Sequence, residues 1–139
     1  MIGDGKPGKT WTRHHYRVGV HLVWGTKHRA PTLAPELRWR LHRLLERICR
    51  EKDCLPYAVG GWTDHVHVYV LLGAQTSVVS LVIALKANSS RWIRRYVPGL
   101  DRFEWGRGYA AIGVDPWRDT ELRRYIATQE AHHGTNPRP

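Results

Sequence analysis

Apolar residues alternate with polar ones, or gather with β-branched and aromatic residues, along four short segments at residues 14–26, 55–62, 64–72 and 103–114. Such segments are typical of strands. Residues 35–53, 77–97 and about 119–133 instead repeat apolar residues at helical spacing, and Ser77 is positioned to cap the second of these helices. The first six segments predict an α+β fold, an antiparallel sheet with two helices on one face. The last helix is additional to this plan.

The strand predicted at residues 64–72 carries two histidines two positions apart. Because side chains alternate faces along a strand, His65 and His67 share one face with Tyr69, and the aliphatic residues between them take the other. The two imidazoles therefore point the same way and can hold one divalent cation. The alternative is two ordinary strand histidines, each partly buried and hydrogen-bonded.

The last predicted helix presents a phenol and an amide together. Tyr125 and Gln129 are four residues apart, so they lie on one helix face about one turn from each other. Arg123 and Arg124 flank the tyrosine with positive charge, and we expect both to contact nucleic acid. The alternative is a surface tyrosine on an amphipathic helix.

Length and charge limit the class of protein. The 139 residues are enough for one domain, in which we expect residues 1–13 to be flexible and residues 115–139 to form the C-terminal helix and tail. Lys and Arg number 22 against 12 Asp and Glu, a net charge of +10 for which nucleic acid is the natural partner. A merely soluble basic protein is the alternative. Candidates for DNA-backbone contacts are Lys86, Arg91, Arg94 and Arg95, although each also suits a solvated helix face.

The two cysteines add no chemistry. Cys49 and Cys54 have neither a CxxC spacing nor a partner pair, so they predict neither a zinc site nor a disulfide framework. This cysteine usage fits a reducing cytoplasm, where we expect the protein to act. No apolar run approaches the length of a membrane span, so we expect no membrane partner.

Together the histidines, the tyrosine and the glutamine suit phosphoryl transfer on DNA. A cation held by His65 and His67 would polarise the scissile phosphate, and a phenolate from Tyr125 would attack in line and become linked to the DNA end. Gln129 would supply an oxygen as third ligand. Two imidazoles, an amide oxygen and water suit Mg²⁺ or Mn²⁺, and the nitrogen donors favour Mn²⁺.

Five segments carry a family resemblance: residues 21–29 (HLVWGTKHR), 64–67 (DHVH), 85–92 (LKANSSRW), 105–109 (WGRGY) and 125–133 (YIATQEAHH). In this order they resemble the HUH single-tyrosine transposases of the smallest bacterial insertion sequences and their domesticated, palindrome-associated relatives. The resemblance implies a ferredoxin-like or RNA-recognition-like sheet that acts on single-stranded DNA with hairpins near the element ends. It also implies His65, His67 and Gln129 as metal ligands and Tyr125 as the nucleophile.

Two alternatives remain open in the sequence. Tyr69 and Tyr109 compete with Tyr125 for the role of nucleophile, although both fit sheet positions better. A non-catalytic or domesticated protein that binds single-stranded nucleic acid would use the same fold and charge. For an active enzyme we expect a homodimer, because excision needs two cuts, with the Tyr125 helix exchanged between chains across a hinge at residues 115–119.

Overall fold

The structure is a computed structural model and describes residues 17–129. The expectations for residues 1–13, for the end of the last helix and for the tail lie outside the described residues. Within them, strands and helices follow the order that the sequence predicts. None of the helices in this part of the chain is long and apolar enough to cross a membrane.

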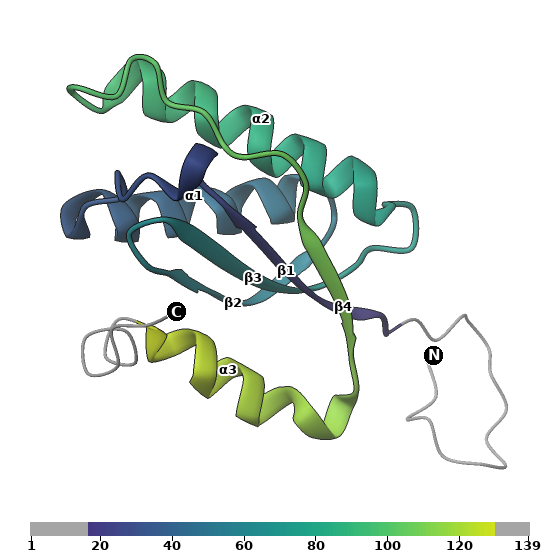
Figure 1. Cartoon of the computed structure of the whole chain (residues 1–139). Helices are drawn as coiled ribbons and strands as arrows, with labels where there is room; N and C mark the ends of the chain where they lie inside the picture. Colours follow the sequence, from purple (N-terminus) through teal and green to yellow (C-terminus); the bar gives the residue numbers. More distant parts are fainter. Residues whose placement is uncertain (1–16, 130–139) are drawn as a thin grey trace, which may run out of the picture.

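Four antiparallel strands form one sheet in the order β2-β3-β1-β4 (Figure 1). The strands are β1 (Gly19–Gly25), β2 (Leu55–Gly61), β3 (His65–Leu71) and β4 (Ala110–Val114). β3 is therefore a central strand, and its His67 lies opposite Val23 of β1. This topology is the split β-α-β arrangement that the sequence predicts.

Two long helices cover one face of the sheet, and a third lies against the other face (Figure 1). The first two are α1 (Pro35–Glu51) and α2 (Val78–Tyr96), and the third is α3 (Asp119–Ala127). Pro35 fits the first turn of α1, where its missing N–H costs nothing, and the Ser77 hydroxyl caps α2 by accepting from the Ser80 amide at 3.1 Å. The predicted cap at Ser77 is confirmed.

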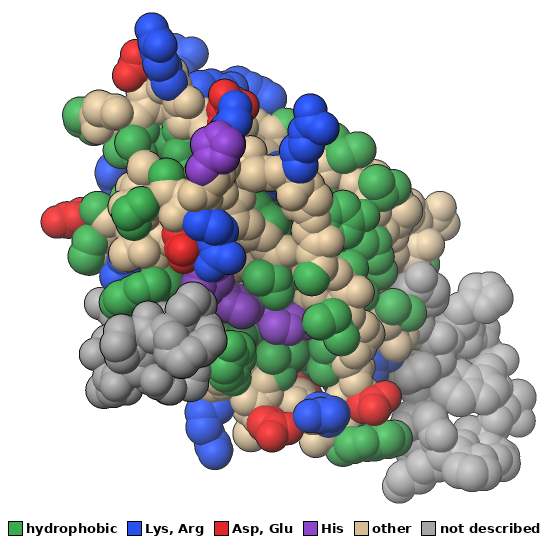
Figure 2. Space-filling view, in the orientation of Figure 1, with side chains coloured by type: hydrophobic (Ala, Val, Ile, Leu, Met, Phe, Trp, Pro, Cys, Tyr) green, Lys and Arg blue, Asp and Glu red, His purple; other side chains and the backbone are tan. Residues whose placement is uncertain are grey.

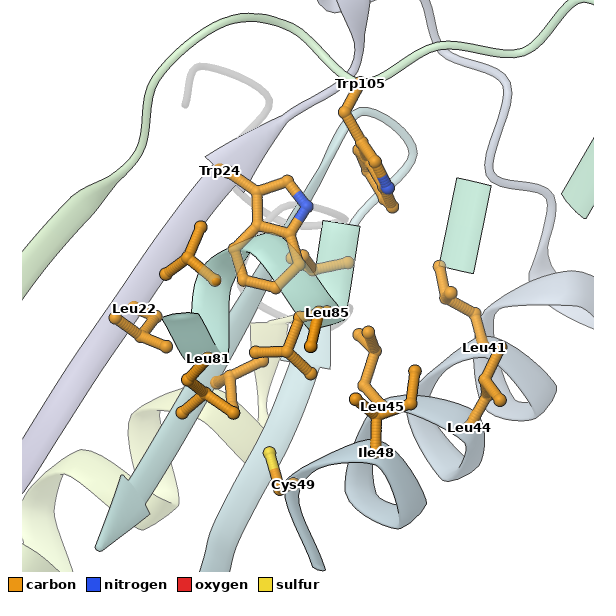
Figure 3. Packing of buried hydrophobic residues seen from close by; sticks show 14 of the residues in the cluster. Leu22, Trp24, Leu41, Leu44, Leu45, Ile48, Cys49, Leu81, Leu85 and Trp105 are labelled. Carbon is orange, nitrogen blue, oxygen red and sulfur yellow. The ribbon is translucent and has the colours of Figure 1, made fainter. Parts of the chain in front are cut away.

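The core lies between the sheet and the pair α1 and α2 (Figure 3). Leucines at helical spacing, among them Leu41, Leu45, Leu81 and Leu85, have no exposed surface. Burying each such side chain contributes about 1.5–3 kcal/mol. Because alternate residues of β1 and β3 enter this core, the residues between them face α3, on the opposite side of the sheet.

The last strand is shorter than expected. The prediction was residues 103–114, but regular pairing begins only at Ala110. The preceding segment is irregular because Phe103 and Trp105 turn into the core, where the Trp105 indole packs edge to face on Trp24 at 5.8 Å. The Trp105 indole N–H also donates to the Ser89 hydroxyl at 2.9 Å.

Candidate active site

Both histidines of β3 lie on the sheet face opposite α1 and α2. His65 and His67 retain 8% and 6% of their exposure, and their ring centroids are 5.0 Å apart. Val66 between them enters the core. The predicted pair of imidazoles on one face of this strand is thus confirmed.

Each of these histidines has a partner at its Nδ1 atom. His65 Nδ1 lies 2.8 Å from Asp64 Oδ1, and His67 Nδ1 lies 2.9 Å from Nε2 of His21 on β1. The His21 and His67 rings also stack, with centroids 5.1 Å apart. Metal-binding imidazoles commonly donate their second N–H to such a group, which fixes the orientation of the ring. In both histidines Nε2 is therefore the nitrogen suited to a cation.

The charges at these partners are set by burial and by neighbouring donors. Partial burial raises the pKa of Asp64. Hydrogen bonds from His65 and Arg29, together with the Arg29 charge, lower it by more, so the pKa lies below its ordinary value. Asp64 is thus an ionised acceptor at neutral pH. Burial lowers the pKa of His21, which favours a neutral imidazole beside His67.

α3 brings a phenol and an amide to the two histidines. The Tyr125 ring lies edge to face against His67 with centroids 5.7 Å apart, and 42% of this tyrosine is exposed. Gln129, two residues beyond the end of α3, is buried, and its Oε1 lies 3.2 Å from His65 Nε2. The structure thus brings together all four residues that the sequence predicted for the centre of the site.

α3 docks on the sheet through a glycine and a tyrosine. Gly60 of β2 lies so close to α3 that a Cβ atom there would be 2.5 Å from the carbonyl oxygen of Ile126. At the start of α3, the Tyr69 hydroxyl donates to Asp119 Oδ1 at 2.6 Å. Burial and this hydrogen bond raise the pKa of Tyr69 to about 12. Tyr69 therefore anchors the helix and is unsuited to act as a nucleophile.

α3 docks on the sheet of its own chain, whereas the expected exchange of this helix between chains stays untested. After β4 the turn η2 (Pro116–Arg118) reverses the chain. The next residue, Asp119, accepts the hydrogen bond from Tyr69. Tyr125 and Gln129 therefore meet the histidines of their own chain. One chain supplies all four residues, so helix exchange is not needed to build the site.

A pocket opens beside the histidines and Tyr125. Figure 2 shows histidine side chains in purple gathered above α3, with Lys and Arg side chains in blue beyond them. The pocket is bounded by Thr26 at the end of β1 and by the loop 106–108. Two exposed arginines, Arg29 and Arg107, also line it, as does Tyr109. Tyr109 thus shares the pocket with Tyr125, but the ring contact with His67 belongs to Tyr125.

The cationic residues predicted on α2 do not join this pocket. Lys86 donates to the carbonyl oxygens of Gly106 at 2.8 Å and Gly108 at 3.1 Å, and burial lowers its pKa. Lys86 therefore holds the pocket loop, and its predicted DNA contact stays a prediction. Arg94 donates to the Phe103 carbonyl at 3.2 Å. These residues belong to the helix pair on the sheet face opposite the histidines.

The other predicted arginines are exposed, and three of them contact neighbouring side chains. Arg91 donates to the Asn88 side chain at 3.1 Å, and the Arg95 guanidinium lies 5.5 Å from the Tyr96 ring centroid. Arg123 pairs with Asp119 at 3.0 Å and covers the Tyr57 ring at 4.0 Å, two helix positions away from Tyr125. The predicted DNA contact of Arg124, which is exposed on α3, stays a prediction.

The donor atoms at the centre of the site fit a divalent cation. Two ligands about 2.1 Å from an octahedral ion, on adjacent positions, are separated by about 3 Å. The separation of His65 Nε2 and Gln129 Oε1, 3.2 Å, agrees with this. Among the described residues, no group of three His, Cys, Asp or Glu side chains could hold a metal ion. An amide oxygen beside two imidazoles is therefore the donor set available, which suits Mn²⁺ or Mg²⁺ better than Zn²⁺.

Two residues that support the site, His21 and Asp64, were not predicted from the sequence. His21 is the polar residue of an otherwise apolar strand, and the period of two places it on the same face as Val23, away from the core. The sequence pattern alone could therefore have indicated His21. Asp64 precedes the first histidine directly, but only the structure shows that it also binds Arg29 at 3.1 Å.

Comparisons with known proteins identify the family and the fold. The model of a protein family described as "Transposase IS200 like" matches residues 14–129. The ISDra2 transposase TnpA of Deinococcus radiodurans is 26% identical over 119 residues, which are 82% of this chain and 85% of that protein.

Two solved structures share the fold. A crystal structure of a Deinococcus radiodurans protein described as a transposase has a TM-score of 0.70 and 25% identity, and the match covers 87% of this chain and 97% of that one. A REP-associated tyrosine transposase bound to a REP hairpin has a TM-score of 0.66 at 14% identity, over 91% of this chain and 74% of that one. The second likeness concerns the fold alone.

Proposed function

Because the chain belongs to the IS200-like transposase family, we propose that it cuts and rejoins single-stranded DNA through a covalent link to Tyr125. The observation that carries this proposal is the meeting of Tyr125 and Gln129 with His67 and His65 in one pocket. Two secondary-structure elements that are distant in sequence supply these groups. Ordinary strand histidines would need no phenol beside them.

His65, His67 and Gln129 hold a divalent cation, Mn²⁺ or Mg²⁺, in this proposal. When bound, the cation supplies positive charge that polarises the scissile phosphate. The residues of the chain do the rest. Asp64 and His21 keep the two imidazoles oriented, and Gly60 lets α3 approach closely enough to bring Tyr125 to the pocket.

The bond changes balance without a further reactant. The Tyr125 phenol loses its proton to solvent, and its oxygen attacks the phosphorus in line with the bond to the 3′ oxygen. That bond breaks, the 3′ oxygen takes a proton, and the 5′-phosphate remains on Tyr125 as a phosphodiester. A 3′-hydroxyl can later attack this phosphotyrosine and release the phenol. The enzyme therefore transfers a strand and does not need a second energy source.

The substrate in this proposal is single-stranded DNA with hairpins at the ends to be cut. The REP-associated relative in the comparison is bound to a hairpin, and the net charge of +10 suits a folded polyanion. Two ends must be cut for excision, yet among residues 17–129 Tyr125 is the tyrosine with a ring contact to the histidines. The active form is therefore a homodimer with one complete site in each chain.

Covalent adduct formation tests the proposal. The DNA is a hairpin oligonucleotide taken from the sequence that flanks the gene, labelled at its 3′ end so that the label stays with the adduct. With Mn²⁺ or Mg²⁺, a denaturing gel should show labelled protein, and EDTA or Tyr125→Phe should abolish it. Tyr109→Phe, in the same pocket, is the matched control and should still form the adduct. An adduct on the Tyr125→Phe variant contradicts the assignment.

Loss of a histidine separates chemistry from binding. His65→Ala removes a cation ligand but no phosphate-neutralising charge, so it should lose cleavage and keep most of its DNA affinity. Fluorescence anisotropy with the same hairpin measures the affinity. A variant that still cuts at the wild-type rate removes His65 from the proposed metal site.

A further inference from the structure

The turn that follows β1 is strained beside the pocket. His28 and Arg29 have φ values of 58° and 54°, so two successive residues with side chains adopt the left-handed region. This conformation is sparsely populated and persists where the surroundings enforce it. Here the Thr26 amide donates to the Asp64 carbonyl at 2.9 Å, and the Thr26 hydroxyl donates to the Ala30 carbonyl at 2.8 Å. The turn η1 (Lys27–Arg29) is thus fixed to the start of β3.

The strained turn aims one side chain at the pocket. Arg29 Nε donates to Asp64 Oδ2 at 3.1 Å, while the other carboxylate oxygen of Asp64 holds His65. The stem of Arg29 passes over Gly25, where a Cβ atom would be 3.0 Å from Arg29 Cδ. Although Asp64 and Gly25 restrict its position, the Arg29 side chain is 56% exposed and lines the pocket with the histidines and Tyr125. Its guanidinium is fixed and still accessible.

A second arginine lines the same pocket, and separate hydrogen bonds hold the backbone on either side of it. Arg107 lies between Gly106 and Gly108, and the ammonium of Lys86 binds the carbonyl oxygens of both glycines. Gly108 has a φ of 79°, which favours glycine. Arg107 is exposed and lines the pocket. Two segments that are distant in the sequence thus each present a guanidinium at one opening.

The positive charge at this opening favours the binding of an anion. The Asp64 carboxylate already accepts from both Arg29 and His65, and Lys27 pairs with Glu104 at 3.3 Å. Among residues 17–129, no acidic side chain lines the pocket. Guanidinium groups bind phosphate oxygens through paired N–H donors, and a guanidinium held in place loses less freedom on binding.

We propose that Arg29 and Arg107 form a phosphodiester-binding site that fixes the DNA strand beside the histidines and Tyr125. The inference rests on the proposed function and names residues that hold its substrate. Arg29 binds a non-bridging oxygen of one phosphodiester in the pocket, and Arg107 binds the same or the neighbouring one. Asp64 then serves two groups, since it orients both the imidazole of His65 and the guanidinium of Arg29.

The alternative is that Arg29 acts only on Asp64 and never touches DNA. Replacement of single phosphates by methylphosphonate separates the two roles, because it removes one negative charge from the DNA and leaves the protein unchanged. Binding is measured in EDTA by fluorescence anisotropy on a single-stranded oligonucleotide that spans the cleavage site. Wild-type protein should lose about tenfold in affinity at one position or at two adjacent positions.

Arg29→Gln decides between the roles. It should bind unmodified DNA about tenfold more weakly and no longer discriminate against methylphosphonate at the sensitive position. Arg107→Gln should lose discrimination at the same or the next position. The matched control is Arg47→Gln on α1, which removes an exposed arginine from the opposite side of the sheet and should keep the wild-type profile.

An Arg29→Gln variant that keeps the wild-type methylphosphonate profile overturns the proposal. Arg29→Lys provides a second test if the glutamine variant does not fold by circular dichroism, because it keeps the charge and loses the paired donors. It should show a reduced but visible sensitivity at the same position. Binding is measured without metal and without cleavage. A failed adduct assay would therefore refute the proposed reaction but would not affect the test of phosphate binding by Arg29.

Discussion

In the proposed metal site, the hydrogen bond between His21 and His67 determines which nitrogen of His67 is available to a cation. The two rings are joined between Nε2 of His21 and Nδ1 of His67 at 2.9 Å. A metal-binding Nε2 must be unprotonated, so the proton of the neutral His67 ring then lies on Nδ1 and is donated to His21. His21 is therefore the acceptor that fixes the metal-binding tautomer.

Replacement of His21 tests this role. His21→Phe keeps a flat ring but has no acceptor, so we expect Mn²⁺ affinity to fall about tenfold. His21→Gln keeps an acceptor oxygen and should retain most of the affinity. Isothermal titration calorimetry without DNA gives both values, and ¹⁵N NMR of the imidazoles reports the tautomer of His67. Equal Mn²⁺ affinity of the Phe and wild-type proteins would show that His21 does not position His67.

A half-buried histidine of α1, His42, makes stability depend on pH. Burial, and to a lesser extent the charge of Arg38, lower the pKa of His42 to about 4. Between pH 6.5 and pH 4 the unfolded chain binds a proton at this histidine that the folded chain does not, so stability falls as the pH falls through this window. From pH 7 to pH 5 this histidine accounts for a loss of about 2 kcal/mol.

Urea unfolding of wild-type protein and His42→Phe at pH 7 and pH 5 measures this contribution. The phenylalanine variant has no group to protonate, so its stability should fall by about 2 kcal/mol less than that of the wild type. Identical losses in the two proteins would mean that His42 is protonated equally in the folded and unfolded states.

Among the elements, α3 determines whether the four central residues meet. Its position depends on Gly60, since a Cβ atom there would also lie 2.9 Å from Ile126 Cγ2. Gly60→Ala should move α3 away from β3 and reduce the rate of adduct formation at least tenfold, because small displacements of reacting groups cost that much. DNA affinity, which depends mainly on cationic residues, should change little.

Gly113→Ala is the matched control for this experiment. Gly113 lies in β4, and a Cβ atom there meets nothing within 4 Å among the described residues. Its rate of adduct formation should stay close to that of the wild type. If Gly60→Ala also keeps the wild-type rate, then close packing of α3 on β2 is not needed to place Tyr125.

The elements themselves were largely predictable, and their packing was not. Alternation on β3 gave the face of His65 and His67, and helical spacing placed Tyr125 and Gln129 on one side of their helix. Neither pattern states which surface a helix packs against. The docking of α3 depends on one glycine and one hydrogen bond from Tyr69, and both become meaningful only when distant segments are side by side.

At the scale of the whole molecule, the positive charge is spread over both sides of the sheet. The arginines of α2 lie with the helix pair, while Arg29 and Arg107 line the pocket with the histidines. Net charge predicted a nucleic-acid partner from the sequence, but it could not predict which cationic residues are near the site. Lys86 illustrates this limit, since its ammonium binds carbonyl oxygens of its own chain.

The assembly of sites within or between chains can be decided by mixing two inactive variants. His65→Ala and Tyr125→Phe are combined under mild denaturant so that their subunits exchange. Because the structure places Tyr125 on the histidines of its own chain, each site keeps one lesion and no adduct should form. Restored adduct formation would show that α3 is exchanged between chains. Light scattering of the unmixed protein reports whether it is a dimer.

The proposed function depends most on Tyr125 as the residue that becomes linked to DNA. After reaction with hairpin DNA and digestion by nuclease and trypsin, mass spectrometry can locate the attached nucleotide. Cleavage after Arg124 places Tyr125 at the start of its peptide, and cleavage after Arg107 and Arg118 places Tyr109 in a different one. We predict the added nucleotide mass on Tyr125 with Mn²⁺ or Mg²⁺ and none in EDTA. The same mass on Tyr109 or Tyr69, or an unmodified Tyr125 in protein that has cut its DNA, would contradict the account.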